Sequence, residues 1–326
     1  MRHILKLLTV MTSTALLAAS LTACDDGGNT GGGDPRENIV KVEQSSSVPF
    51  TYFYHIPEGT SAKPVTGLVL IASAAGQATS YAEVENTSLS ILGGYISNLD
   101  FKPPPGFILF TVAFNKGESL SRDDLESTTE GDLRVDLKFL KVVNHLKGAL
   151  AEAGYTLDPQ IFVTGFSGGG SCCNRITLLH PTLIKAATPK AVGQPWTMPL
   201  ASYQGIQFPY HIGVLDFERL GLGPFDLESF KRIPFFVFIG ASDSNDGLLE
   251  CGAGKGCSGL EWYQIVFYTN FFGNTVQERA ESFHIQLIAL GMNSAFKSYP
   301  GVGHYRTSEM DKDVFNFFSS FPLNSP

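Results

Sequence analysis

The sequence GFSGG at residues 165–169 places Ser167 between glycines, directly after the apolar run 161–164. A G-x-S-x-G pattern between a strand and a helix is typical of a nucleophilic serine, because the tight turn lifts the hydroxyl above the sheet. The Gly168 N–H, at the start of the helix, would then point toward an oxygen that gains negative charge. We interpret Ser167 as a nucleophile; the alternative is a glycine-rich turn with an incidental serine.

A serine hydroxyl becomes a good nucleophile when a base takes its proton, and histidine is the usual base. The histidines after the serine are His180, His211, His284 and His304. His180 lies in the helix that follows the turn, His211 lies in an irregular stretch, and His284 lies among apolar residues of a predicted helix, where a structural role is expected. His304 ends the loop PGVGH after a late strand, so we predict His304 as the base.

An acid must orient that imidazole and stabilise its cation. The apolar run FFVFI at 235–239 is followed by GASDSND at 240–246. Asp243 and Asp246 therefore both lie just past the carboxyl end of a predicted strand, at the edge where α/β sheets bind ligands. We predict Asp243 as the acid and assign Asp246, which precedes a glycine, to a turn.

Stabilising a tetrahedral intermediate takes a second N–H donor besides that of Gly168. The loop ASAAGQ at 72–77 follows the predicted strand 66–71, and its small residues allow close backbone approach. We predict the Ala75 N–H as this donor, with Ala74 as the second choice.

Beyond residue 38, short apolar runs alternate with helical patterns. Strands are predicted at 50–56, 66–71, 107–114, 161–164, 185–192, 235–239 and 295–299, and helices at 133–153, 168–180, 275–290 and 309–318. Continuous apolar strands separated by helices indicate a mostly parallel sheet covered on both faces. Apolar residues on neighbouring faces of the helix at 133–153 predict that it is largely covered by protein. Residues 194–233 break the pattern and are interpreted as an inserted lid, with an irregular crossover as the alternative.

The first 24 residues have the pattern of an export signal. A basic start is followed by the apolar run 7–19 and by small residues before Cys24, which describes a secretory signal. The apolar run is shorter than the ~20 residues of a membrane span. Because it ends in LTAC, it resembles a bacterial lipoprotein signal, in which the cysteine is lipidated. An ordinary signal with an accidental cysteine is the alternative.

This interpretation divides the chain into a signal at 1–23, a flexible glycine-rich tether at 24–38 and a catalytic domain at 39–326. It predicts an exported protein anchored by lipid to the bacterial cell envelope, on its periplasmic or extracellular face. The 326-residue chain is 43% hydrophobic and 17% charged, which suffices for a substantial core. Its net charge of −8 without a basic stripe argues against a nucleic-acid partner.

Four further cysteines follow Cys24. Cys251 and Cys257 bracket the loop CGAGKGC, and export would allow a disulfide between them. Cys172 and Cys173 are adjacent, and both disulfide bonding and a role as small buried thiols stay open for them. No CxxC pair occurs and no histidine lies beside these cysteines, so a metal site is not expected.

The stretch 132–170 reads DLRVDLKFLKVVNHLKGALAEAGYTLDPQIFVTGFSGGG. It is similar to the segment leading to the nucleophile in extracellular esterases of the polyhydroxybutyrate depolymerase and feruloyl esterase group. FTYFYHIP at 50–57 resembles the opening strand of those enzymes, and GASD followed by GVGH resembles their acid and base loops. The resemblance spans about residues 48–320. The usual His-Gly before the first oxyanion donor is replaced here by Ser73-Ala74.

The resemblance implies an α/β-hydrolase fold with catalytic roles for Ser167, Asp243 and His304. It implies a serine esterase that hydrolyses small or polymeric carboxylic esters through an acyl-enzyme, such as polyhydroxyalkanoate, feruloyl or aryl esters. No metal or organic cofactor is required for this reaction, and a monomer is expected. The alternatives are a serine peptidase or lipase with the same triad, and a lipid-anchored binding protein with a catalytically decayed fold.

Overall fold

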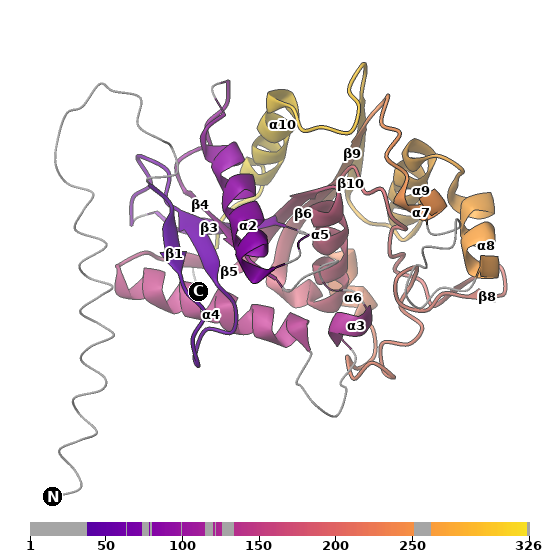
Figure 1. Ribbon diagram of the computed structural model, residues 1–326, viewed down its shortest axis with the longest axis horizontal. Helices are drawn as coiled ribbons and strands as arrows, with labels where there is room; N and C mark the ends of the chain where they lie inside the picture. The colour runs from indigo at the N-terminus through magenta and orange to yellow at the C-terminus, as the bar shows by residue number, and fades with distance from the viewer. Residues whose placement is uncertain are drawn as a thin grey trace, which may run out of the picture. The chain divides into compact units, whose positions relative to one another are not determined.

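The computed structural model describes residues 38–324 apart from 63, 74–77, 79, 99, 115–119, 121, 126–133 and 251–261. Eight strands of this part form one sheet (Figure 1). In spatial order they are β1 (Val40–Val42), β2 (Tyr52–His55), β4 (Phe107–Val112), β3 (Thr66–Ala72), β5 (Leu157–Phe166), β6 (Ile184–Lys190), β9 (Phe235–Gly240) and β10 (Ser294–Tyr299). β1, β2 and β4 pair antiparallel, and every pairing from β4 to β10 is parallel.

Helices cover both faces of this sheet, as predicted. One face packs against α2 (Tyr81–Ile96) and α10 (Ser308–Ser319), and the other against α4 (Val135–Glu152), α5 (Gly168–Leu179), α8 (Trp262–Phe272) and α9 (Val276–Ala289). Along β3, Val69 and Ile71 face the first set of helices while Leu68 and Leu70 face the second. Because both faces are buried, β3, β4 and β9 are continuous apolar runs instead of alternating ones. Figure 1 shows α2 and α10 on the opposite side of the sheet from α4.

Helix α4 corrects one expectation. Its buried face carries Val135, Phe139, Val142 and Leu146, whereas Leu137 is 41% exposed. The prediction that this helix is largely covered by protein is therefore wrong. One face of α4 packs on the sheet, and the other face, which carries most of its charged and polar residues, contacts solvent.

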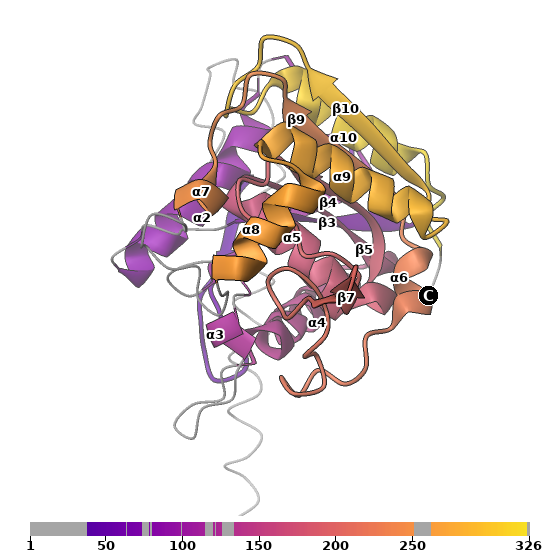
Figure 2. The same ribbon diagram turned by 90° about the vertical axis from the view of Figure 1, so that its right-hand side faces the viewer.

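Residues 194–233 connect β6 to β9 and include the short elements β7 (Ser202–Tyr203), β8 (Ile206–Gln207) and α6 (Leu227–Lys231). The fully buried Trp196 stacks on Phe283 of α9, with 4.5 Å between ring centroids, and its carbonyl accepts a hydrogen bond from Tyr268 of α8. Figure 2 shows α8 and α9 side by side next to this segment. The insertion is thus part of the packed domain; its role as a lid stays a prediction.

None of the helices built by the described residues combines the length and the hydrophobicity of a membrane-spanning segment.

Candidate active site

Ser167 occupies a tight turn between β5 and α5. Its backbone has φ 57° and ψ −122°, a left-handed conformation that is uncommon for a residue with a side chain and that often marks functional sites. The Ser167 N–H donates to the carbonyl of Lys190 at the end of β6, 3.0 Å away. The strand, turn and helix thus lie where the sequence placed them, and the turn presents the hydroxyl at the carboxyl edge of the sheet.

The two outer glycines of this turn are required by close backbone contacts. A Cβ atom on Gly165 would collide with the carbonyl of Gly169, and one on Gly169 would collide with the carbonyl of Ala72 in β3. Neither glycine has a left-handed backbone. The G-x-S-x-G pattern therefore reflects how closely the first turn of α5 packs on β3 and β5.

Three predicted residues lie within hydrogen-bond distance in series. His304 Nε2 is 2.9 Å from Ser167 Oγ, and His304 Nδ1 is 2.9 and 3.1 Å from the two carboxylate oxygens of Asp243. The Asp243 side chain is 1% exposed and that of His304 is 23% exposed. A carboxylate beside Nδ1 favours the tautomer with its proton there, which leaves Nε2 able to accept the serine proton. The ring of Phe166 packs against the imidazole, with 4.9 Å between centroids.

The loops that carry the acid and the base contact each other directly. The Ser242 N–H donates to the carbonyl of Val302 at 2.9 Å. A Cβ atom on Gly240 would collide with that same carbonyl, so the glycine that ends β9 permits the approach. Asp243 and His304 therefore lie on loops whose backbones are hydrogen-bonded to each other.

Helix α9 holds the acid loop from the other side. The side-chain amide of Gln277 donates to the carbonyls of Gly240, Ala241 and Asp243, at 3.2, 3.4 and 2.5 Å. Thr275 and Glu278 form a capping box that fixes this first turn of the helix. No local sequence pattern indicates Gln277, because its partners lie more than thirty residues away.

Asp246 has a different partner from Asp243. Its Oδ1 lies 2.6 Å from Nη2 of Arg279, a fully buried residue of α9. The same oxygen accepts the N–H of Leu248, 3.1 Å away. The structure thus brings Asp243, and not Asp246, to the imidazole.

The remaining histidines after Ser167 lie elsewhere. His180 Nε2 is 3.2 Å from a carboxylate oxygen of Asp136, and His284 Nδ1 is 2.9 Å from the hydroxyl of Ser294. His211 is buried in the insertion. Among the histidines of the described chain, His304 is the one whose ring reaches the Ser167 hydroxyl.

Of the two predicted oxyanion donors, one is described. Gly168 begins α5, so its N–H is among the first four of the helix, which have no carbonyl partner within the helix. Ala75 and Ala74 lie outside the described residues. Ser73, just before them, is buried, and its hydroxyl lies 3.1 Å from that of Ser88 in α2.

The cysteine predictions are divided in the same way. Cys24, Cys251 and Cys257 lie outside the described residues. Cys172 and Cys173 are buried in α5, and Cys173 Sγ lies 3.5 Å from the Val163 carbonyl. Burial raises the pKa of the Cys173 thiol well above its ordinary value, which makes it unreactive.

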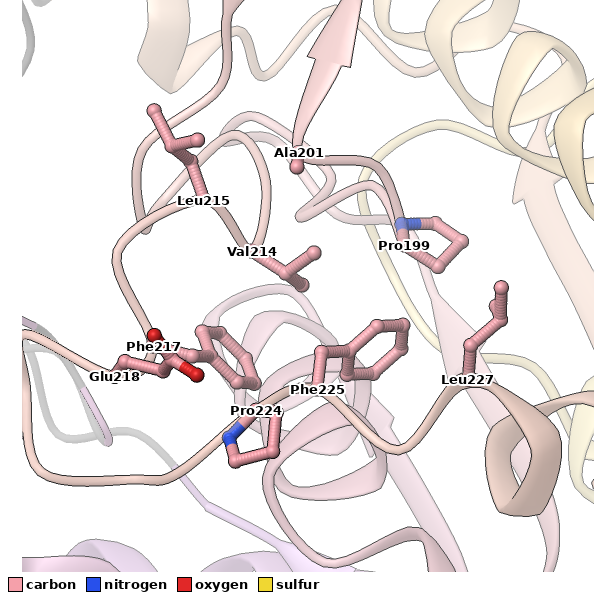
Figure 3. Close-up of a pocket in the computed structure, with 9 residues that line it drawn as sticks. All are labelled: Pro199, Ala201, Val214, Leu215, Phe217, Glu218, Pro224, Phe225 and Leu227. Carbon is pink, nitrogen blue, oxygen red and sulfur yellow. The ribbon is translucent and has the colours of Figure 1, made fainter.

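A cavity of about 340 Å³ opens within the insertion at 194–233 (Figure 3). It is lined by Pro199, Ala201, Val214, Leu215, Phe217, Glu218, Pro224, Phe225 and Leu227. Neither Ser167 nor His304 lines it, so it is not the space in which the serine would meet a substrate. Within the described ranges, no group of three or more His, Cys, Asp or Glu side chains has the arrangement of a metal site.

No protein-family model matches the chain, and no curated protein matches its sequence. Among solved structures, poly(aspartic acid) hydrolase-1 from Sphingomonas sp. KT-1 superimposes with a TM-score of 0.56 at 13% identity, covering 86% of this chain and 96% of that one. A thermostable esterase has a TM-score of 0.49 at 15% identity, covering 86% of this chain and 63% of that one. A ferulic acid esterase from the anaerobic fungus Anaeromyces mucronatus has a TM-score of 0.42 at 13% identity, covering 85% and 87%.

The first of these likenesses, at 13% identity, shows the fold alone. The fold of that hydrolase matches the mostly parallel eight-stranded sheet of this chain, which helices cover on both faces. The chain therefore has the α/β-hydrolase fold.

Proposed function

We propose that this protein is a serine esterase that hydrolyses carboxylic esters through a covalent acyl-enzyme. The observation that supports this most is the hydrogen-bonded series from Ser167 through His304 to Asp243, at 2.9 Å for each link. The serine sits on a strained turn at the carboxyl edge of the sheet, where it is partly exposed. Its G-x-S-x-G sequence and its resemblance to extracellular esterases point to esters among the possible acyl substrates.

In the proposed reaction, His304 Nε2 takes the hydroxyl proton while Ser167 Oγ attacks the ester carbonyl carbon. The negative charge on the carbonyl oxygen is stabilised by the Gly168 N–H and by the Ala75 N–H, the second donor that the sequence suggests. His304 then gives the proton to the leaving alcohol, which departs as the acyl-enzyme forms. A water molecule repeats these steps, with His304 as its base, and releases the carboxylic acid and the free serine. Asp243 orients the imidazole and stabilises its cation throughout.

The test is covalent labelling of the full-length protein with a fluorophosphonate, together with ester hydrolysis by wild type and Ser167→Ala. We expect the variant to lose labelling and to have a kcat about 10⁶-fold lower. Ser171→Ala is the matched control, because Ser171 lies one turn further along α5 and is buried, whereas Ser167 is partly exposed. It should label like wild type. Equal labelling of wild type and Ser167→Ala would show that another residue is the nucleophile.

A serine peptidase or lipase is the alternative within the same chemistry. Short aryl esters, feruloyl sugars, hydroxyalkanoate oligomers, long-chain acylglycerols and peptide anilides should be compared in one screen. We expect turnover of one or more of the first three classes and little cleavage of the anilides. Preferential anilide cleavage that depends on Ser167 would assign a peptidase, whereas preference for long-chain acylglycerols would assign a lipase.

We also propose that the enzyme is exported and held on a bacterial membrane by lipid on Cys24. The basic start, the short apolar run, the LTAC ending and the glycine-rich tether support this. Stable anchoring needs more than one acyl chain, each buried CH₂ contributing ~0.8 kcal/mol. Wild-type protein should incorporate labelled fatty acid and sediment with membranes, whereas Cys24→Ser should not incorporate it. Absence of lipid on wild-type protein, measured by mass spectrometry, would contradict the proposal.

A further inference from the structure

A buried cluster of charged side chains lies behind the loop that carries His304, on the face covered by α2 and α10. It contains Lys190, the last residue of β6, and Asp311 of α10, which are 0% and 1% exposed. It also contains Arg306, two residues after His304, with 22% exposure. The proposed reaction uses none of these side chains.

The contacts of this cluster are specific. Lys190 Nζ donates to the Tyr95 hydroxyl at 2.7 Å and to Asp311 Oδ1 at 3.2 Å. Arg306 Nε lies 3.1 Å from the other carboxylate oxygen of Asp311. The central carbon of the Arg306 guanidinium lies 3.9 Å from the centroid of the Tyr95 ring, so the cation sits on the aromatic face.

Helix α2 is shaped to admit this guanidinium. A Cβ atom on Gly94 would come within 2.9 Å of Arg306 Nη2, closer than real Cβ contacts. The neighbouring residue Tyr95 supplies the ring on which the guanidinium lies. We call the space between Gly94 and the ring of Tyr95 the slot. A planar, weakly hydrated guanidinium fits this slot, whereas the compact and strongly hydrated ammonium of lysine does not.

The cluster reaches the proposed catalytic residues at two points. The backbone carbonyl of Lys190 accepts the N–H of Ser167 at 3.0 Å. Arg306 lies between His304 and Thr307, whose side chain accepts the Met310 N–H and caps α10. The cluster therefore links the turn that holds the serine to the loop that holds the histidine.

Stability is a weak explanation for such a cluster. Removing two cations and a carboxylate from water is costly, and their mutual attraction offsets much of that cost without a large surplus. What the contacts do supply is direction, because a stacked guanidinium with an ion-paired Nε has little freedom to move. An imidazole displaced by about 1 Å can lose on the order of 10²-fold in rate.

We propose that Arg306 is a positioning residue for His304, held in place by Tyr95, Asp311 and Lys190. This inference rests on the proposed function, because it assigns Arg306 the task of keeping His304 Nε2 at hydrogen-bond distance from Ser167. Arg306 contacts the ring of Tyr95 and not the reacting atoms, so its loss should lower turnover and leave substrate binding nearly unchanged.

The experiment compares Arg306→Lys and Arg306→Ala with wild type in the full-length protein. Arg306→Lys keeps the charge but loses the planar stacking, and we expect its kcat to fall about 10- to 100-fold with KM within about two-fold. Arg306→Ala should fall further. Millimolar guanidinium should restore part of its activity by refilling the slot beside Gly94, whereas sodium chloride of equal ionic strength should not.

Lys297→Met is the matched control. Lys297 of β10 also forms ion pairs with α10, through Glu309 and Asp313, and lies 4.3 Å from the centroid of the Tyr299 ring. The substitution therefore removes ion pairs with α10 and a contact with a tyrosine ring, and it leaves the loop from His304 to Thr307 unchanged. We expect wild-type kcat for this control. An equal loss in Lys297→Met and Arg306→Lys would reduce the effect to general destabilisation and overturn the positioning role.

A spectroscopic readout separates this inference from the proposed function. The His304 Nδ1–H bonded to Asp243 should give a proton resonance downfield of the amides, assigned by its absence in His304→Gln. We expect it in wild type and Lys297→Met, and expect it to broaden or disappear in Arg306→Lys. If Ser167→Ala stays active, the proposed function fails, whatever this resonance does. If Ser167→Ala is inactive but Arg306→Lys matches wild type in kcat and in this resonance, the positioning role fails and the function stands.

Discussion

Asp246 Oδ1 lies 2.6 Å from Nη2 of the fully buried Arg279, while Asp243, three residues earlier, contacts His304. The two aspartates of one short loop therefore face different partners. Arg279 fastens the far end of the loop to α9, and Gln277 holds the near end through three carbonyls. Asp243 is presented to the imidazole by a loop that is fixed on both sides of it.

This division predicts opposite effects for two conservative substitutions. Asp243→Asn should keep the fold but lower kcat by about 10⁴-fold, because an amide holds the imidazole in the wrong tautomer. Asp246→Asn should keep kcat within about ten-fold but lower the free energy of unfolding by about 3 kcal/mol, because it leaves a buried guanidinium without its carboxylate. Kinetics on a common aryl ester and thermal unfolding measure both. A crippled Asp246→Asn with an active Asp243→Asn would reverse the assignment.

Gly165→Ala tests the packing of the serine turn. The new Cβ would collide with the carbonyl of Gly169, which is backbone of the first turn of α5 and cannot rotate away. We expect the free energy of unfolding to fall by about 2 to 3 kcal/mol. Fluorophosphonate labelling of Ser167 should also slow, since the turn that aims its hydroxyl must shift.

Gly148→Ala is the matched control for that experiment. Gly148 lies inside α4, and a Cβ atom there meets nothing within 4 Å. Alanine loses less backbone entropy on folding, so this variant should be more stable than wild type by about 0.5 to 1 kcal/mol. If Gly165→Ala were as stable as Gly148→Ala, the close contact at the turn would be disproved.

Much of the fold follows from local pattern. Strands β3, β4 and β9 are apolar along most of their length because both faces are covered, so each gives a run such as FFVFI that is visible in the sequence. The predicted ends of the strands indicated which polar residues lie at the carboxyl edge of the sheet. Ser167, Asp243 and His304, which follow β5, β9 and β10, do meet there. Position relative to a strand was the signal that led to Asp243 and His304, and the structure places both side chains in series with Ser167.

What the sequence did not indicate depends on contacts between distant elements. Helix α2 was not predicted, because Ser, Thr and Asn interrupt its apolar pattern and two glycines lie near its end. One of these, Gly94, accommodates Arg306 from the other end of the chain. Helix α8 was also missed, since WYQIVFYTNFF is apolar around the helix and lacks a clear period. Nothing local marks Gln277 or Arg306 as neighbours of the proposed catalytic residues.

Cys251 and Cys257 should be bonded to each other in exported protein. Only five residues separate them, and the intervening GAGKG contains three glycines, so the chain can close the loop without a strained side chain. Peptide mapping without reduction should show one linked peptide and no modification of these cysteines by a thiol reagent. Recovery of either cysteine bonded to Cys172 or Cys173 would show that the predicted pairing is wrong.

Asp136 lies in the first turn of α4 and is fully buried. Arg134 donates to both of its carboxylate oxygens at 2.8 Å, and His180 lies 3.2 Å from one of them. Burial alone would raise the pKa of Asp136, but the hydrogen bonds from Arg134 and His180 outweigh it and hold the pKa well below its ordinary value. This carboxylate anchors α4 to the end of α5, the helix that begins beside Ser167.

A pKa lower in the folded than in the unfolded protein means that the unfolded chain binds the proton more readily as the pH falls. The stabilisation by Asp136 is therefore complete above the unfolded pKa of about 3.9 and is lost as the pH falls below it, toward the lowered folded value. Asp136→Asn should lower the free energy of unfolding by about 3 kcal/mol at pH 6 and bring the two proteins closer together at pH 3.

Glu228→Gln is the control, because it removes an exposed carboxylate that is ion-paired at the surface with Lys231. Its free energy of unfolding should differ little from that of wild type at either pH. Denaturant unfolding of the three proteins at both pH values measures this. An undiminished difference between wild type and Asp136→Asn at pH 3 would show that the carboxylate charge is not what holds these helices together.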